Sequence, residues 1–257
     1  MAKKRKTYGS MRPFIWATVV AAALFFGYLF YLWAITPRPS SVRYRQFGIS
    51  IPTAYSIHGI DVSRYQQNIS WRLVKEMKVS NIQLGFAFIK ATEGNNLVDP
   101  FFNRNWKKAR EAGITRGAYH FFNPKKDGRS QAKRFMNTVE LQSGDLPPVL
   151  DIEKGWGVSK AKLQQEVRAW LVAVEQAYGV KPILYTYVTF YEKYLQGAFD
   201  DYPLWIAHYY QPGSPRISRA WHFWQHSEEG HVNGIGNRVD FNVFNGDSAD
   251  FRALLLP

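Results

Sequence analysis

The sequence predicts an α/β fold, an irregular (β/α) barrel of the TIM type with about five βα units followed by three further strands. Two observations favour this fold. From residue 56 onward, short apolar runs alternate with helix-like segments, which is typical of parallel βαβ units. Eight such runs occur, and eight strands suggest a closed barrel. A doubly wound open sheet is the main alternative, but no glycine-rich phosphate loop follows the first run.

The candidate strands are the eight apolar runs, at residues 57–62, 84–91, 117–122, 148–152, 182–187, 204–209, 222–226 and 239–244. Helical patterns separate the first six runs, at residues 71–79, 103–112, 130–141, 159–178 and, more weakly, 189–195. The segments between the last three runs are too short, or too rich in proline and glycine, for full helices. The barrel is therefore expected to be irregular toward the C-terminus.

The N-terminal segment is expected to lie outside the barrel. A basic tail, residues 1–13, precedes an uncharged apolar run of 22 residues from Phe14 to Ile35, which is long enough to cross a hydrocarbon core of about 30 Å. The excess of basic residues before this run places the N-terminus in the cytoplasm. We therefore expect a transmembrane signal-anchor helix at 14–36, a tether at 37–55, and a barrel domain at 56–257 on the periplasmic side of the cytoplasmic (inner) membrane.

Composition narrows the class of partner. The formal net charge is +13, and six basic residues without acids lie in residues 1–40, so the remainder carries 13 − 6 = +7. This surplus is spread along the chain without an arginine-rich block, so no nucleic-acid partner is predicted. Attraction to an anionic polymer such as cell-wall glycan fits equally well. Cysteine is absent, so the chain has no disulfide framework that would indicate its compartment.

Carboxylates gather where predicted strands end or begin. Asp151 and Glu153 are two residues apart, so in an extended strand they project to the same side, with α-carbons about 6–7 Å apart. Asp61 ends the first strand and Asp240 begins the eighth, and closing the barrel brings these strands together. Four acids around one mouth raise the pKa of at least one member. Hydrolysis of a glycosidic bond requires such a protonated acid beside a charged carboxylate.

Flat aromatic side chains at the same strand ends are suited to stacking on sugar rings. They are Tyr119, Phe121, Tyr185, Trp205, Tyr209 and Trp224. Taken singly, each is more often part of barrel packing. A metal site is the other use of clustered carboxylates, but His58 and His120 lie within apolar runs, where hydrogen-bonded framework roles are commoner. We expect acid catalysis without a metal or another cofactor.

Six segments in order resemble the motifs of glycoside hydrolase family 25, the lysozymes of the Chalaropsis type. These segments are residues 59–63, 90–94, 116–121, 150–153, 205–207 and 239–242. The resemblance runs from about residue 57 to 246. It implies an irregular (β/α) barrel and cleavage of the β-1,4 bond after N-acetylmuramic acid in peptidoglycan.

The resemblance also implies roles for individual residues. Glu153 matches the proton donor, and Asp151 matches a second carboxylate that serves as base, as nucleophile or as partner of the substrate's acetamido group. Asp61 and Asp240 match two further acids of the groove. Whether the reaction retains or inverts configuration stays open, because an α-carbon spacing does not give the separation of the carboxyl groups.

Sugar contacts are implied for four further residues, which are Lys90, Tyr119, Tyr185 and Tyr209. Lys90 could pair with the lactyl carboxylate of muramic acid, whereas Glu93 is expected to be structural. Tyr65 departs from the tryptophan that many relatives carry in the first loop, and its flat ring predicts tuned binding.

Three functions are compatible with these residues. The first is a membrane-anchored muramidase acting on peptidoglycan strands, and the second is a non-catalytic glycan-binding module that uses the same groove. The third, a chitinase-like glycosidase, would carry a longer D-x-x-D-x-D-x-E motif, of which only the last two acids are present here. The four acids favour the muramidase. The oligomeric state does not follow from the sequence.

Overall fold

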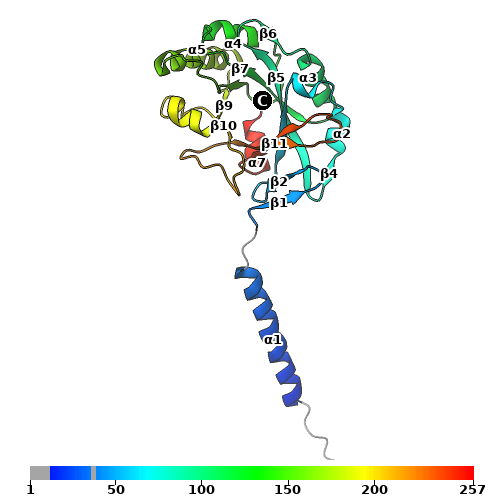
Figure 1. Ribbon diagram of the computed structural model, residues 1–257. Helices are drawn as coiled ribbons and strands as arrows, with labels where there is room; N and C mark the ends of the chain where they lie inside the picture. Colours follow the sequence, from blue (N-terminus) through cyan, green and yellow to red (C-terminus); the bar gives the residue numbers. More distant parts are fainter. Residues whose placement is uncertain (1–11, 36–38) are drawn as a thin grey trace, which may run out of the picture. The chain divides into compact units, whose positions relative to one another are not determined.

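The computed structural model describes residues 12–35 and 39–257, and the chain divides between Pro39 and Ser40 into two compact units (Figure 1). In the first unit, helix α1 covers Arg12–Ile35. Among the described residues, no helix combines the length and the apolar character needed to span a membrane. The prediction of a transmembrane helix at 14–36 is therefore contradicted. Residues 1–11 of the predicted basic tail lie outside the described residues.

The second unit is a closed barrel of eight strands. In chain order these are β3 (His58–Val62), β5 (Ile82–Glu93), β7 (Thr115–Phe121), β8 (Val149–Asp151), β9 (Ile183–Tyr187), β10 (Leu204–Ala207), β11 (Phe223–Gly230) and β12 (Val239–Phe244). Each strand pairs with the next in this order, and β12 closes the ring on β3. The short strands β4 (Lys78–Val79) and β6 (Leu97–Val98) pair with β5.

Helices surround the barrel between successive strands (Figure 1). They are α2 (Trp71–Glu76), α3 (Phe102–Glu111), α4 (Gly128–Met136) and α5 (Lys160–Tyr178). The shorter turns are η1 (Arg64–Gln66), α6 (Val188–Phe190) and η2 (Tyr191–Leu195), and α7 (Ser248–Leu254) follows the last strand. Helix α5 begins where the side chain of Ser159 accepts a hydrogen bond from the Lys162 N–H and ends at Gly179, which takes a left-handed conformation.

The predicted TIM-type (β/α) barrel is wrong, because the structure is an eight-stranded closed β-barrel with helices outside. A TIM-type barrel has eight parallel strands, each followed by a helix. Here β12 runs antiparallel to both β11 and β3, and within residues 39–257 no helix separates β10 from β11 or β11 from β12. The connection between β11 and β12 is residues 231–238. It is shorter than the roughly 10–12 residues that a parallel crossover needs, so the chain returns antiparallel.

Apolar side chains fill two layers. Inside the barrel, Phe86, Phe88, Trp205 and Phe223 form the centre of one cluster, and the Phe88 ring stacks on that of Trp205 with centroids 4.3 Å apart. A larger second cluster includes the residues between the strands and the surrounding helices. Gly59 on β3 makes room for the inner cluster, because a Cβ there would come within 2.5 Å of the Phe86 ring.

A β-hairpin precedes the barrel strands. Strands β1 (Ser41–Tyr44) and β2 (Ile49–Pro52) pair antiparallel, and Phe47 at the turn is buried with its ring 5.3 Å from that of Phe241 on β12. The segment 37–55, which the sequence suggests as a tether, thus contains a hairpin packed on the barrel. Its apolar residues at alternate positions, Phe47, Ile49 and Ile51, supply the reason.

Candidate active site

Two carboxylates meet where the barrel closes. Asp61 on β3 lies opposite Asp240 on β12 in the antiparallel register, and their side chains share a hydrogen bond. The Oδ2 atom of Asp61 also accepts hydrogen bonds from Asn242 Nδ2 at 2.7 Å and from Gln225 Nε2 at 2.8 Å. Asp61 is therefore fixed in orientation by its neighbours from β11 and β12.

Gln225 links this pair to two tyrosines. Its Oε1 atom accepts hydrogen bonds from the hydroxyl of Tyr185 at 2.8 Å and from that of Tyr209 at 2.7 Å. Since its Nε2 donates to Asp61, one amide positions three side chains. Sequence analysis did not select Gln225 or Asn242. A polar amide inside an apolar run was the available signal, because a buried amide must find partners.

The other two acids follow strand β8. Asp151 is its last residue and is buried, and Glu153 is partly exposed two residues further on. Burial, then the charge of Glu153, raises the pKa of Asp151 well above its usual range. Burial also raises the pKa of Glu153, against a hydrogen bond to Tyr185 that lowers it. Within residues 12–35 and 39–257, the Oδ1 atom of Asp151 has no hydrogen-bond partner.

Burial and mutual repulsion give Asp61 and Asp240 different pKa values, so the two acids differ in protonation state. The pKa of Asp61 rises to about 6 through burial, and hydrogen bonds from Asn242 and Gln225 limit the rise. The pKa of Asp240 rises to about 9 through burial and then the charge of Asp61. At neutral pH, Asp240 therefore keeps its proton and donates it in the hydrogen bond to an ionised Asp61.

We expect Asp240→Asn to flatten the pH dependence of stability. The folded-state pKa of Asp240, about 9 against an ordinary 3.8, means that folding takes up a proton. The stability tied to this proton is complete below the unfolded pKa and is lost as the pH rises toward about 9. Asparagine is neutral throughout and still donates to Asp61. The melting temperature of the wild type should therefore fall relative to the variant between about pH 5 and 9, and exposed Asp201→Asn is the control. Parallel curves would contradict the assignment.

A lysine lies beside the acids. Lys90 on β5 is buried, its Nζ lies 2.7 Å from Oε2 of Glu93, and it sits 4.6 Å from the centroid of the Phe121 ring. The charge of Lys90 lowers the pKa of Asp151. Lys90 and Phe121 therefore stand at the edge of the acid cluster, and Glu93 holds the lysine in place.

The predicted aromatic side chains occupy different depths. Tyr119 and Tyr185 are buried members of the inner cluster, and Trp205 is 1% exposed, with its Nε1 donating to Asn242 Oδ1 at 2.8 Å. Trp224 is fully buried in the larger cluster outside the barrel, and its Nε1 donates to the carbonyl of His208 at 2.9 Å. Of this group, Tyr185 and Tyr209 line an open hollow together with Glu153.

Two hollows adjoin at Glu153. One, of about 410 Å³, includes Tyr185 and Tyr209, and the other, of about 440 Å³, includes Trp156. Both share Glu153 and Tyr187, so they form a groove that passes the carboxylate. Trp156 and Tyr187 are 42% and 39% exposed. The sequence analysis did not select these two rings: Tyr187 is the last residue of β9, and Trp156 lies in the loop between β8 and α5.

The described residues offer no group of three or more His, Cys, Asp or Glu side chains arranged to hold a metal ion. The chemistry that the site supports is proton transfer by carboxyl groups of unequal pKa. Such groups beside a groove with exposed aromatic rings define a glycoside-cleaving enzyme.

Comparison with known proteins agrees with this class. Residues 60–235 match the family model described as glycosyl hydrolases family 25, and the chain belongs to that family. It is 36% identical over 217 residues to lysozyme M1 of Streptomyces globisporus, covering 77% of this chain and 71% of that protein. It is also 49% identical over 211 residues to the uncharacterized protein YegX of Escherichia coli K12, covering 82% and 78%.

A solved structure gives the same result. The structure of a family 25 glycosyl hydrolase from Bacillus anthracis superposes with a TM-score of 0.74 at 31% identity, covering 84% of this chain and all of that chain. The protein is therefore a glycoside hydrolase with the barrel of this family.

Proposed function

We propose that this glycoside hydrolase is a lysozyme that cleaves peptidoglycan at the β-1,4 bond between N-acetylmuramic acid and N-acetylglucosamine, with Glu153 as its general acid. The position of Glu153 carries the proposal. It lies where both halves of the groove meet, and burial raises its pKa, which keeps a proton available for the leaving oxygen. Peptidoglycan lies outside the cytoplasm, so we also propose that the barrel acts there.

Asp151 is the second carboxylate of the reaction. Its Oδ1 atom is buried without a partner in the described chain, and an unsatisfied buried acceptor costs about 1–3 kcal/mol. An acetamido N–H of the substrate would satisfy this oxygen and place the sugar for reaction. When Glu153 holds its proton, the charge that helps to raise the pKa of Asp151 is absent, and an ionised Asp151 then stabilises the oxocarbenium character that develops at the anomeric carbon.

Asp61 and Asp240 act on the substrate from the closing seam of the barrel. Asp61 is held by Asn242 and Gln225, and the same Gln225 holds the hydroxyls of Tyr185 and Tyr209. This preorganised network fixes the groove wall before substrate binds. Lys90 supplies the positive charge that suits an acidic or strongly polar substituent of muramic acid.

Product analysis tests the function directly. We expect the full-length protein, incubated with purified peptidoglycan, to release fragments whose reducible end is muramic acid, identified by reduction and mass spectrometry. Fragments ending in N-acetylglucosamine would contradict the choice of bond. Binding without any new reducing ends would instead indicate a glycan-binding module.

A further inference from the structure

The groove that passes Glu153 has a positively charged end. This end is the hollow of about 440 Å³, which is lined by Lys154 and Trp156 from the loop after β8 and by Lys193 from η2. Among the described residues that line this hollow, Glu153 is the one acid, and burial disfavours its ionised form. Two ammonium groups therefore dominate the charge at this end of the groove.

The two lysines of this hollow are available to a ligand. Lys154 and Lys193 are exposed, and within residues 39–257 neither ammonium group has a hydrogen bond or an ion pair. Lys193 instead lies over the ring of Tyr194, with its Nζ 5.1 Å from the centroid. By contrast, Lys162 on α5 is paired with Glu166 at 2.5 Å. An anionic group that enters the hollow therefore meets two cations that no protein group neutralises.

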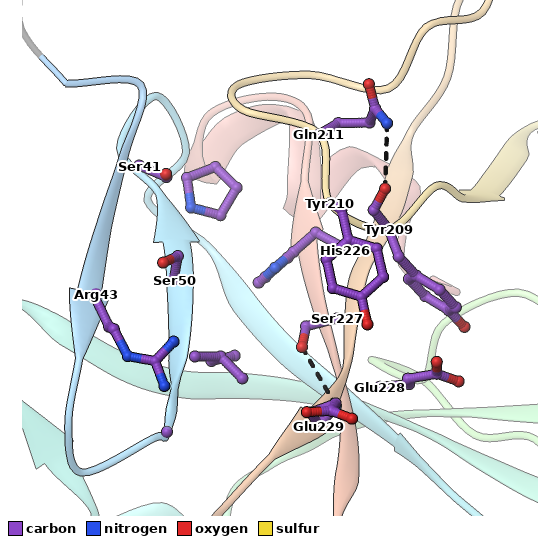
Figure 2. Close-up of a pocket in the computed structure, with 13 residues that line it drawn as sticks. Ser41, Arg43, Ser50, Tyr209, Tyr210, Gln211, His226, Ser227, Glu228 and Glu229 are labelled. Atoms are coloured by element: carbon purple, nitrogen blue, oxygen red, sulfur yellow. Dashed lines mark hydrogen bonds between the residues drawn. The ribbon is translucent and has the colours of Figure 1, made fainter.

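The other end of the groove, at Tyr209, carries acidic charge. Tyr209 also lines a further hollow, of about 200 Å³, and Figure 2 shows Glu228 beside Tyr209, on the side of β11 away from Arg43. After burial and the charges of Asp240 and Asp61, the charge of Glu228 further raises the pKa of Tyr209. An anionic part of the substrate is therefore disfavoured at this end and favoured at the lysine end.

The conformation of Trp156 indicates that the lysine end is shaped for a ligand. Its side chain lines the hollow together with Glu153 and stays 42% exposed. Its backbone has φ of +41°, and a non-glycine residue with a left-handed backbone costs on the order of 1–3 kcal/mol. The neighbours Gly155 and Gly157 have no side chains that would cover the ring. A flat apolar face beside the general acid is suited to a sugar ring.

The positive charge identifies the part of the substrate that binds at this end. In peptidoglycan the N-acetylglucosamine units are neutral, whereas the peptide stem on the lactyl group of muramic acid carries free carboxylates. We propose that Trp156 stacks on a sugar of the glycan strand and that Lys154 and Lys193 bind carboxylates of the peptide stem beside it. This inference rests on the proposed action on peptidoglycan.

Lys193 is the position to test. The charge of Lys154 also acts on the general acid, because after burial and the hydrogen bond to Tyr185 it lowers the pKa of Glu153. The full-length protein is assayed on two substrates. One is soluble peptidoglycan fragments with intact stems, and the other is the same fragments after an amidase has removed the stems and left the lactyl carboxylate.

We expect Lys193→Gln to lower kcat/KM about three- to fivefold on intact fragments, as loss of one exposed ion pair would. On stripped fragments the variant should match the wild type. Lys193→Arg keeps the charge and should retain the wild-type rate on both substrates. Trp156→Ala should lower kcat/KM on both, because the ring contacts the sugar and not the stem.

The matched control is Lys181→Gln, because Lys181 is also exposed but precedes β9, whereas Lys193 follows it, so the two lie toward opposite ends of the barrel. Equal losses for Lys193→Gln on both substrates would show that Lys193 binds the sugar or its lactyl group. Unchanged rates on both would show that it binds no part of the substrate. Either result overturns the proposal, as does a loss in Lys193→Arg equal to that in Lys193→Gln. A wild-type protein that cleaves neither substrate would instead contradict the proposed function.

Discussion

Glu153→Gln should remove peptidoglycan cleavage, with a fall in the rate of reducing-end release of about 10³-fold or more, at the upper part of the range for a lost general acid. Glutamine has nearly the same shape and can keep a hydrogen bond with Tyr185, but it has no proton to give to the leaving oxygen. The variant should fold normally. Since burial disfavours the ionised form of Glu153 and so raises its pKa, a neutral glutamine is compatible with this buried position.

The measurement is release of reducing ends from purified peptidoglycan, with circular dichroism and melting temperature as checks on folding. Glu76→Gln is the matched control, because Glu76 on α2 is exposed and its ion pair with Arg72 is its only one among the described residues. A folded Glu153→Gln protein that keeps more than about a tenth of the wild-type rate would exclude Glu153 as the general acid, because such an acid contributes at least about 10²-fold.

Arg116→Met should cost about 3 kcal/mol in the free energy of unfolding, near the lower end of the range for breaking a buried ion pair. The side chains of Arg116 and Asp145 are each 4% exposed, and two hydrogen bonds of 2.8 and 3.1 Å join them. The guanidinium also donates to the carbonyl of Trp106 at 2.7 Å and lies 3.9 Å from the Trp106 ring. Exposed Arg110, 3.7 Å from Asp145, offers partial compensation.

Urea unfolding at neutral pH measures this effect. Arg72→Met is the control, because the Arg72–Glu76 pair is exposed on both sides and such pairs contribute at most about 1 kcal/mol. The double variant Arg116→Met with Asp145→Asn should regain part of the loss, since it removes the charge left unpaired. Equal costs for Arg116→Met and Arg72→Met would show that the buried pair contributes little.

Residues at strand ends were the most predictable part of this protein. Each of the eight apolar runs overlaps a barrel strand, and the pairing of Asp61 with Asp240 follows from closing the ring. The strand direction was not predictable from apolar runs, because a run has the same composition whichever way it points. The antiparallel β12 therefore escaped the sequence analysis.

The face of a strand on which a side chain lies was predicted less well. Trp224 and Gln225 are neighbours in one strand, so their side chains must point to opposite faces. Gln225 points to the acids, which places Trp224 in the outer layer. Because side chains alternate along a strand, choosing Gln225 as the functional residue would have placed Trp224 on the other face. The hydrogen bonds that join Gln225 to three distant side chains depend on the tertiary structure and leave no local pattern.

The seam between β3 and β12 has a consequence for biosynthesis. Asn242 and the carboxylate it holds, Asp61, are separated by 181 residues, and Asp240 enters from the same final strand. The Asp61–Asp240 pair therefore does not exist until the last strand has docked against the first, a contact of long sequence separation. A partly synthesised chain, or one cut before residue 239, would lack half of its acid pair. We therefore expect wall-degrading activity only after β12 has closed the barrel on β3.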